Sequence, residues 1–358
     1  MTNVVRAIAV ILALVVVVAA AGAWQLNRAM TRPLAVPDGG TTFVIDPGSS
    51  FRTVARNLVE QGLIERDFWL RVSARWSGAA NSIHAGEYRI EPGTTPYRLL
   101  GLFEEGAVQL YAFTIIEGWN RYDLLNALRD SEIIDASLTD EDWPAFLAEL
   151  RASVAKPVGI WDKMGLSDDN PEGLFLPETY NLPRGISDRE FLKMAFMLMR
   201  STLIHEWNQR SEDTAVKTHY EALILASIIE KETARTDERQ RISGVFTRRL
   251  EKRMRLQTDP TVIYGIGPGF NGNITRKDLR TDTPYNTYTR HGLPPTPIAM
   301  PGQAAIHAAL HPADGEELFF VATGLGDGSH AFSKTKDEHD AAVAEYLKRL
   351  RQNRREGR

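Results

Sequence analysis

The chain has 358 residues, with 42 Lys and Arg against 46 Asp and Glu, so its formal net charge at pH 7 is −4. This length is enough for two or three domains with a sizeable core. A mildly acidic chain lacks the basic surface that nucleic acids bind, so we expect no nucleic-acid partner. The absence of Cys excludes disulfides, thiolate metal sites, a Cys nucleophile and a lipidated N-terminal Cys.

The N-terminus is strongly apolar. The 18 residues from Ala7 to Trp24 are apolar or small, and the next charge is Arg28. Such a run can cross a bilayer core as a helix, and it lacks the polar face of a soluble helix. It is either a cleaved signal peptide, with Ala19–Ala23 as the cleavage region, or an uncleaved anchor. Because the run is longer than a usual signal-peptide core, we predict a transmembrane signal anchor over residues 1–28.

A weak internal repeat follows a Pro- and Gly-containing linker at residues 29–41. Three times within residues 42–135 a β-type string leads to a Gly, with apolar residues six and ten positions after it. The three glycines are Gly48, Gly93 and Gly118. Each repeat predicts a short strand, a Gly turn and an amphipathic helix. Helix N-caps are available at Ser49 or Ser50, at Thr94 or Thr95, and at Asn120.

The first repeat resembles a LysM-type module, a β-α-α-β glycan-binding fold. Phe68, Trp69 and Trp76 on its second helix have the chemistry to stack on sugar faces. Their spacing fits core packing equally well, and we expect at least two of the three to lie in the core.

The second half of the chain is predicted to be one larger domain. A Gly- and Asp-rich stretch marks a connecting segment at 136–170, and a catalytic domain is expected at 171–350. Its expected elements are helices at 188–205, 238–254 and 336–351, a strand at 318–322, and a long loop-rich section between 259 and 301. Loops of that length are often functional. Residues 351–358 form a basic tail.

One carboxylate follows an unusually apolar helical segment. Seven of the eight residues from Ala222 to Ile229 are apolar, and Glu230 comes next. Partial desolvation would raise the pKa of Glu230 and suit it to act as a general acid near neutral pH. The alternative is that Glu230 marks the point where the helix reaches water.

Several ordered strings resemble the MltG (YceG-like) family of endolytic murein transglycosylases, from about residue 40 to about residue 347. The strings are Glu172–Tyr180, Ala226–Glu232, Leu256–Gly265, Tyr285–Tyr288, Gly292–Ile298 and Ala308–Pro312. With the patterns above, the resemblance implies an α+β chain. It would consist of a transmembrane helix, a LysM-like strand/helix repeat region and a mixed α/β catalytic domain outside the cytoplasm.

The resemblance also implies a reaction, cleavage of the bond between N-acetylmuramic acid and N-acetylglucosamine. An acid protonates the leaving oxygen and then accepts the proton of the muramic acid 6-hydroxyl, which closes a 1,6-anhydro ring. One carboxylate suffices, unlike in ordinary glycoside hydrolysis, and the motif match makes it Glu230. Glu232 points away round the helix, and we expect a structural or ion-pairing role for it.

Five further residues in these strings are candidates for substrate binding. Gln257, Asp259 and Asn286 are placed to hold an N-acetyl group or to orient the catalytic carboxyl. The alternatives are an Asp-Pro turn for Asp259 and a turn or helix cap for Asn286. Tyr285 is a cleft-wall or core residue, and the role of Glu178 is open.

We expect no metal and no cofactor. His307 and His311 have the i, i+4 spacing of metal ligands on a helix, but the sequence indicates no third ligand. The Ser333–Lys336 string matches the Ser-x-x-Lys of penicillin-recognising enzymes without its partner motifs, so it is interpreted as chance.

These observations predict a single-pass protein of the cytoplasmic (inner) membrane with a periplasmic lytic transglycosylase domain. It would cut nascent peptidoglycan glycan strands and limit their elongation, with peptidoglycan synthases as further partners. The first alternative is a non-catalytic peptidoglycan-binding scaffold of the cell-wall synthesis machinery. The second is a hydrolase that releases reducing ends.

Overall fold

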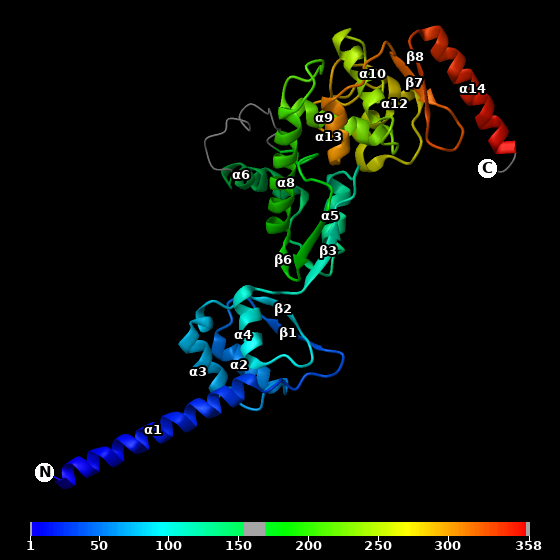
Figure 1. Ribbon diagram of the computed structural model, residues 1–358. Coiled ribbons are helices and arrows are strands. Elements are labelled where there is room, and N and C mark those ends of the chain that lie inside the picture. Colours follow the sequence, from blue (N-terminus) through cyan, green and yellow to red (C-terminus); the bar gives the residue numbers. More distant parts are fainter. Residues whose placement is uncertain (1, 154–168, 356–358) are drawn as a thin grey trace. The chain divides into compact units, whose positions relative to one another are not determined.

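The computed structural model describes residues 2–153 and 169–355 (Figure 1). The chain divides into two compact units. Unit 1 comprises Met1–Ala112 and Asn181–Ile186, and unit 2 comprises Phe113–Tyr180 and Ser187–Arg358. The predicted repeat region at 42–135 is therefore shared, because its first two strand–helix repeats lie in unit 1 and its third begins unit 2. Much of the predicted connecting segment, 154–168, lies outside the described residues.

Unit 1 begins with the apolar helix α1 (Thr2–Thr31). Within the described chain, Val4–Thr31 is the helix that is long and apolar enough to cross a membrane, and the apolar window has no buried residue. Its C-terminal end is different, since Met30 packs into the core of unit 1. The helix thus leads directly into the folded unit.

The rest of unit 1 contains the β-α-α-β order expected for the first repeat. Strands β1 and β2 pair antiparallel, with Thr41 opposite Ile90 and Ile45 opposite Gly86. The core is a cluster of buried apolar side chains that includes Phe43, Tyr88 and Phe103. The elements of this part are β1 (Thr41–Ile45), α2 (Phe51–Glu60), α3 (Phe68–Ser77), a short 3₁₀ turn (Ala79–Asn81), β2 (Gly86–Ile90) and α4 (Pro96–Glu105).

The strand–turn–helix form of all three repeats is confirmed. β1 leads to α2, β2 leads to α4, and β3 (Leu110–Thr114) leads to α5 (Arg121–Arg129). Each repeat glycine has a φ between 77° and 85°, which a residue with a Cβ adopts only with strain. Ser50, Thr95 and Asn120 accept hydrogen bonds from backbone N–H groups of the first helical turn.

The aromatic residues of α3 differ from the prediction. Phe68 is 53% and Trp76 is 82% exposed, while Trp69 is half-buried and contacts the edge of the Phe68 ring. The expectation that at least two of them lie in the core is therefore wrong. Their exposure arises because Leu70 and Ala74 form the buried face of this short helix.

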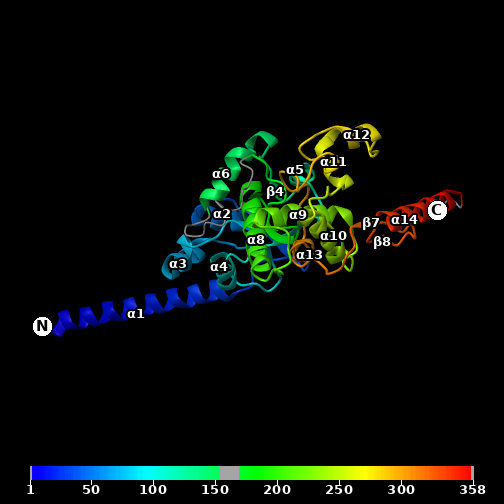
Figure 2. The same cartoon turned by 90° about the horizontal axis from the view of Figure 1, so that it is seen from above.

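Unit 2 is organised around α9 (His219–Glu232), in which every residue from Ala222 to Ile229 is buried. Helix α13 (Gln303–Leu310) lies along it in both views (Figure 1, Figure 2). The helices that surround this pair are α8 (Asp188–Asn208), α10 (Arg239–Glu251) and α11 (Asp259–Ile266). A central helix covered on all sides explains the apolar run that precedes Glu230.

Short two-stranded sheets complete the structure, and the described strands pair only two by two. β3 pairs with β5 (Thr179–Pro183), and β4 (Ile134–Asp135) pairs with β6 (Ile186–Ser187). β7 (Phe319–Ala322) and β8 (His330–Ser333) form an antiparallel hairpin against which α14 (Lys336–Arg355) packs. The remaining helical elements are a 3₁₀ turn (Asp140–Asp142), α6 (Trp143–Ser153), a 3₁₀ turn (Gly267–Gly269) and α12 (Arg276–Arg280).

The predicted helices and the predicted strand of the second half are found as α8, α10, α14 and β7. The section from 259 to 301, expected as loops, contains two helices, α11 and α12. Both helices are short and begin at polar or Pro-containing positions. A helix of this length gives too few apolar repeats for the 3.6-residue period to be recognised in the sequence. Thr275 and Asp278 form a capping box that starts α12.

Candidate active site

Glu230 lies in the last turn of α9, and its side chain is only 5% exposed. It therefore does not mark a point where the helix reaches water. Burial raises the pKa of this carboxyl above its ordinary value, and the negative charge of Glu117 acts in the same direction. The Gly302 N–H, Arg239 and Lys231 oppose this rise without cancelling it.

Both oxygens of Glu230 are held in place. Arg239 Nη2 donates to Oε1 at 2.8 Å, and the backbone N–H of Gly302 donates to Oε2 at 3.0 Å. The two donors come from the first turn of α10 and from the segment that precedes α13. A carboxyl fixed from two sides keeps one orientation toward whatever binds beside it.

A second carboxylate lies on the same guanidinium. Arg239 Nη2 is 3.5 Å from Glu117 Oε2, and the Glu117 side chain is 49% exposed. A Cβ at Gly302 would overlap the Glu117 carboxylate, so Glu117 would have to move if Gly302 were replaced. Arg239 thus joins a buried carboxyl, Glu230, to a half-exposed one, Glu117.

Sequence reasoning missed both Glu117 and Arg239. A signal for Glu117 was present in the repeats, because Pro47 and Pro92 precede the first two repeat glycines and Glu117 precedes the third. A Glu that replaces a turn-forming Pro in an otherwise regular repeat indicates a requirement for its charge. Arg239 carries no comparable pattern.

Backbone contacts attach the turn of the third repeat to the site. Gly118 N donates to Met300 O at 2.9 Å, and Met300 N donates to Trp119 O at 2.7 Å. Lys231 Nζ donates to Gly118 O at 3.1 Å. These bonds hold the Glu117 turn, the end of α9 and the segment before Gly302 together.

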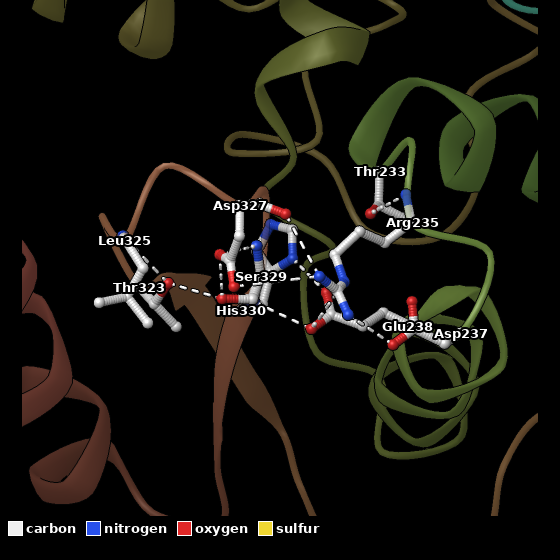
Figure 3. Close-up of polar contacts among 9 residues, drawn as sticks. All are labelled: Thr233, Arg235, Asp237, Glu238, Thr323, Leu325, Asp327, Ser329 and His330. Carbon is white, nitrogen blue, oxygen red and sulfur yellow. Dashed lines mark hydrogen bonds and ion pairs between the residues drawn. The ribbon is translucent and has the colours of Figure 1, made fainter.

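Arg239 is positioned by the residue that precedes it. Glu238 Oε1 accepts from the backbone N–H of His330, and Glu238 Oε2 lies 2.7 Å from His330 Nδ1 (Figure 3). Arg235 reaches from the same turn to Asp237 and to the backbone oxygen of Asp327 (Figure 3). The β7–β8 hairpin therefore fixes the start of α10 and, with it, the guanidinium that holds Glu230.

A cavity of about 640 Å³ lies beside this arrangement. Glu117 and Arg239 line it, as does Glu178, the exposed carboxylate of the Glu172–Tyr180 string. Glu206 and His307 also face it. A volume of this size accommodates a sugar ring with its substituents.

Glu232 has a different environment from Glu230. It is half-buried, it accepts a hydrogen bond from the Thr258 hydroxyl, and burial raises the pKa of its carboxyl. It therefore anchors the Leu256–Gly265 string to the end of α9. This contact matches the structural role expected for it.

The structure does not bring the other predicted residues onto Glu230. Among the described residues, no hydrogen bond or ion pair joins that carboxylate to Gln257, Asp259, Asn286 or Tyr285. Gln257 is exposed and has a φ of 52°. Asp259 accepts from the Tyr288 hydroxyl at 2.5 Å, and Tyr285 Oη lies 2.9 Å from Thr296 Oγ1.

Asn286 holds the backbone of its own loop. Its side chain is buried, and Nδ2 donates to the carbonyl oxygens of Asp278, Leu279 and Thr281 at 2.7–3.2 Å. Its Oδ1 accepts from Tyr288 N. This arrangement corresponds to the turn and cap alternative for Asn286, because all its polar atoms are used within the loop.

The arrangement supports proton transfer. A carboxyl group whose pKa is raised by burial is suited to donate a proton to an oxygen placed beside it, and Arg239 can then stabilise the carboxylate that forms. Glu117 adds a negative charge on the solvent side, where a developing positive charge would be stabilised. Glu206, His307 and His311 are the described residues whose side chains could hold a metal ion.

Comparisons with known proteins agree on one family. The sequence model of the YceG-like family matches residues 43–345. An endolytic murein transglycosylase of Bacillus subtilis (strain 168) is 30% identical over 336 residues, which cover 91% of this chain and 90% of that protein.

More distant relatives extend the comparison. Endolytic murein transglycosylases of two Streptococcus pneumoniae strains are 26% identical over 86% of this chain, which spans 58% of their length. The crystal structure of a yceG-like protein of Listeria monocytogenes superposes with a TM-score of 0.55 at 27% identity. The match covers 84% of this chain and 98% of that one.

Proposed function

Because the chain belongs to the YceG-like family, we propose that it is an endolytic murein transglycosylase that cleaves the glycan strands of peptidoglycan. The observation that carries this proposal is Glu230, a buried carboxyl with a raised pKa that is held by Arg239, a residue that lines the cavity. The relatives that bear this name match almost the whole chain, including the region that contains Glu230.

In the proposed reaction, Glu230 donates its proton to the oxygen between N-acetylmuramic acid and N-acetylglucosamine. The bond from that oxygen to the muramic acid anomeric carbon breaks, and positive charge develops at that carbon. The 6-hydroxyl oxygen of the same sugar then bonds to the anomeric carbon, and its proton passes to the Glu230 carboxylate. The product is a 1,6-anhydro end, no water is consumed, and Glu230 regains its starting state.

Glu117 and Arg239 have distinct roles in this scheme. The Glu117 carboxylate raises the pKa of Glu230 and faces the positive charge of the transition state. Arg239 stabilises the ionised form of Glu230 after the first proton transfer. We assign Glu178 to the substrate-binding wall, since it lines the cavity.

Hydrolysis is a second candidate, and one observation favours it. Glycosidases that hydrolyse their substrates use two carboxyl groups, and Glu117 supplies a second one near Glu230. In that case Glu117 would activate a water molecule, and the product would have a reducing end. A non-catalytic scaffold is a weaker candidate, because it would not need a buried carboxyl held by two donors.

We further propose that the repeats bind glycan and that α1 anchors the protein in the inner membrane with unit 2 in the periplasm. The LysM-like order of unit 1 and the exposed Phe68 and Trp76 support glycan binding. The length and apolar surface of Val4–Thr31 support anchoring. The anchored enzyme would act beside peptidoglycan synthases, where cleavage of nascent glycan strands would limit their elongation.

The deciding experiment is mass spectrometry of the products that the purified full-length protein releases from isolated peptidoglycan. A lytic transglycosylase gives anhydro ends, which are lighter than reducing ends by one water. Reducing ends alone would establish the hydrolase, and intact strands would support the scaffold.

A further inference from the structure

The ends of α8 and α13 bring together one carboxylate and two imidazoles. Glu206 lies in the last turn of α8, His307 lies in α13, and His311 follows the end of α13. A ligand atom of each lies within 4.8 Å of the ligand atoms of the other two. The sequence indicated His307 and His311 but no third ligand, and the structure places Glu206 beside them.

Glu206 is oriented like a metal-binding carboxylate. Its side chain is 6% exposed, and Gln303 Nε2 donates to Oε1 at 2.9 Å. Oε2 lies 2.9 Å from His307 Nδ1. These two contacts compensate part of the free-energy cost of burying the carboxylate, and a cation bound by Glu206 would add a full counter-charge.

The surroundings of His311 give an independent indication. Its Nδ1 lies 3.0 Å from His307 O, and its Nε2 lies 2.8 Å from Gln209 O. A neutral imidazole carries one N–H, so one of these nitrogens presents a lone pair to a carbonyl oxygen. A divalent cation that drew this nitrogen away from the carbonyl oxygen would remove that repulsion.

Charge and geometry select the kind of ion. The adjoining cavity is lined by the carboxylates of Glu117, Glu178 and Glu206 against one guanidinium, Arg239. Imidazole nitrogens favour zinc and similar transition metals over magnesium and calcium. Zinc–ligand bonds of about 2.0–2.1 Å separate ligand atoms by about 3.3 Å. The rings of His307 and His311 stack with their centroids 4.1 Å apart, so one ring would turn out of this stack for both to bind the same ion.

We propose that Glu206, His307 and His311 bind a divalent transition-metal ion, with Zn²⁺ as the best fit. The ion would tie the end of α8 to the end of α13. Gln303 would orient Glu206 from the second layer, as outer-layer partners of metal ligands commonly do. The proposal is independent of the reaction at Glu230.

The test is Zn²⁺ binding to the full-length protein, purified in detergent and stripped with a chelator, by isothermal titration calorimetry and metal analysis. We expect one Zn²⁺ per chain, no competition from excess Mg²⁺, and a rise in melting temperature. His307→Ala and His311→Ala should each weaken binding at least about tenfold, and Gln303→Leu by about 10–100-fold. His291→Ala is the matched control, since His291 is exposed and contacts Arg253 O instead.

A lack of stoichiometric Zn²⁺ binding would overturn the proposal. Binding that His307→Ala and His311→Ala leave unchanged would overturn it as well, because the ion would then sit elsewhere. The melting temperature without metal shows whether each variant is folded. If Ala variants unfold, His307→Gln replaces His307→Ala, since it keeps a hydrogen-bonding side chain next to Glu206.

Discussion

Glu230 Oε1 and Arg239 Nη2 form an ion pair at 2.8 Å, in which the two side chains are 5% and 6% exposed. Arg239 also lies 3.5 Å from Glu117, so one positive charge serves two carboxyl groups. Burial of Glu230 and the negative charge of Glu117 both raise the pKa of Glu230, while the positive charge of Arg239 opposes that rise.

The first prediction separates the two carboxylates of α9. Glu230→Gln keeps the shape but cannot donate a proton, so we expect a folded protein with product formation reduced by about 100-fold or more. Glu232→Gln keeps an acceptor for Thr258 and should retain activity within about tenfold of wild type. The measurement is the rate of product release from isolated peptidoglycan. A Glu230→Gln protein that works at near wild-type rate would show that the acid is another residue.

The second prediction concerns pH. Glu230 acts while protonated, so activity falls as pH rises through its pKa. The Glu117 charge helps to raise that pKa, although burial is the larger cause. Glu117→Gln should therefore lower the pKa of Glu230 and move the alkaline limb of kcat/KM to lower pH.

Glu178→Gln serves as the control for this shift. It removes a carboxylate from the same cavity, yet Glu178 is not among the main charges that act on Glu230. The alkaline limb of kcat/KM should therefore lie at the same pH in Glu178→Gln as in wild type. If the limb moved equally in both variants, the effect would be the general charge of the cavity rather than the contact through Arg239.

Much of the fold follows from local sequence patterns. The three repeat glycines, their helix caps and the apolar run before Glu230 are local signals, and the structure confirms the elements they predict. The partners of Glu230 are not local. Glu117 and Gly302 lie 113 and 72 residues away along the chain, and no periodicity links them to α9.

The candidate substrate residues also have contacts that the sequence does not reveal. Gln257, Asp259 and Asn286 stand out in the sequence because their strings are unusual. The side-chain amide of Asn286 hydrogen-bonds to the backbone of its own loop, and the Asp259 carboxylate accepts a hydrogen bond from the Tyr288 hydroxyl. An unusual string marks a constrained backbone as readily as a substrate contact, and side-chain geometry is needed to distinguish the two.

The third prediction tests the role of Asn286. Asn286→Ala removes the donor to three carbonyl oxygens and should lower the free energy of unfolding by about 1–3 kcal/mol. Asn286→Asp should be worse than Ala, because a carboxylate would face those oxygens. Urea unfolding checks the order, with the exposed Asn273→Asp as a control. Equal stability of Asn286→Asp and wild type would contradict this role.

The fourth prediction concerns glycan binding by unit 1. Phe68→Ala and Trp76→Ala remove exposed aromatic surface, so they should leave stability within about 0.5 kcal/mol of wild type. If these rings stack on sugars, the variants should bind peptidoglycan strands more weakly in a sedimentation assay. Tyr97→Ala is the control, since Tyr97 is 73% exposed on α4. Unchanged sedimentation would leave the two rings without a role in glycan binding.

The last prediction follows from Glu172, which is fully buried and whose pKa burial raises to about 7. The Arg121 N–H, 3.1 Å from Oε2, opposes this rise only in part. In the unfolded chain the pKa is near 4.5. The folded state therefore holds a proton on Glu172 between about pH 4.5 and pH 7 that the unfolded state has lost. By linkage, the contribution of Glu172 to stability is complete below pH 4.5 and is lost as pH rises to about 7, on the order of 3 kcal/mol in total.

Glu172→Gln imitates the protonated form at every pH. The variant should match wild type near pH 4.5 and be the more stable protein at pH 8, as measured by urea unfolding across this range. The exposed Glu251→Gln is the control and should follow the wild-type curve. Parallel curves for Glu172→Gln and wild type would mean that Glu172 ionises in the folded protein as it does in water. In that case a compensating positive charge would have to reach it, and Arg121, which the structure places beside Tyr122, is the nearest candidate.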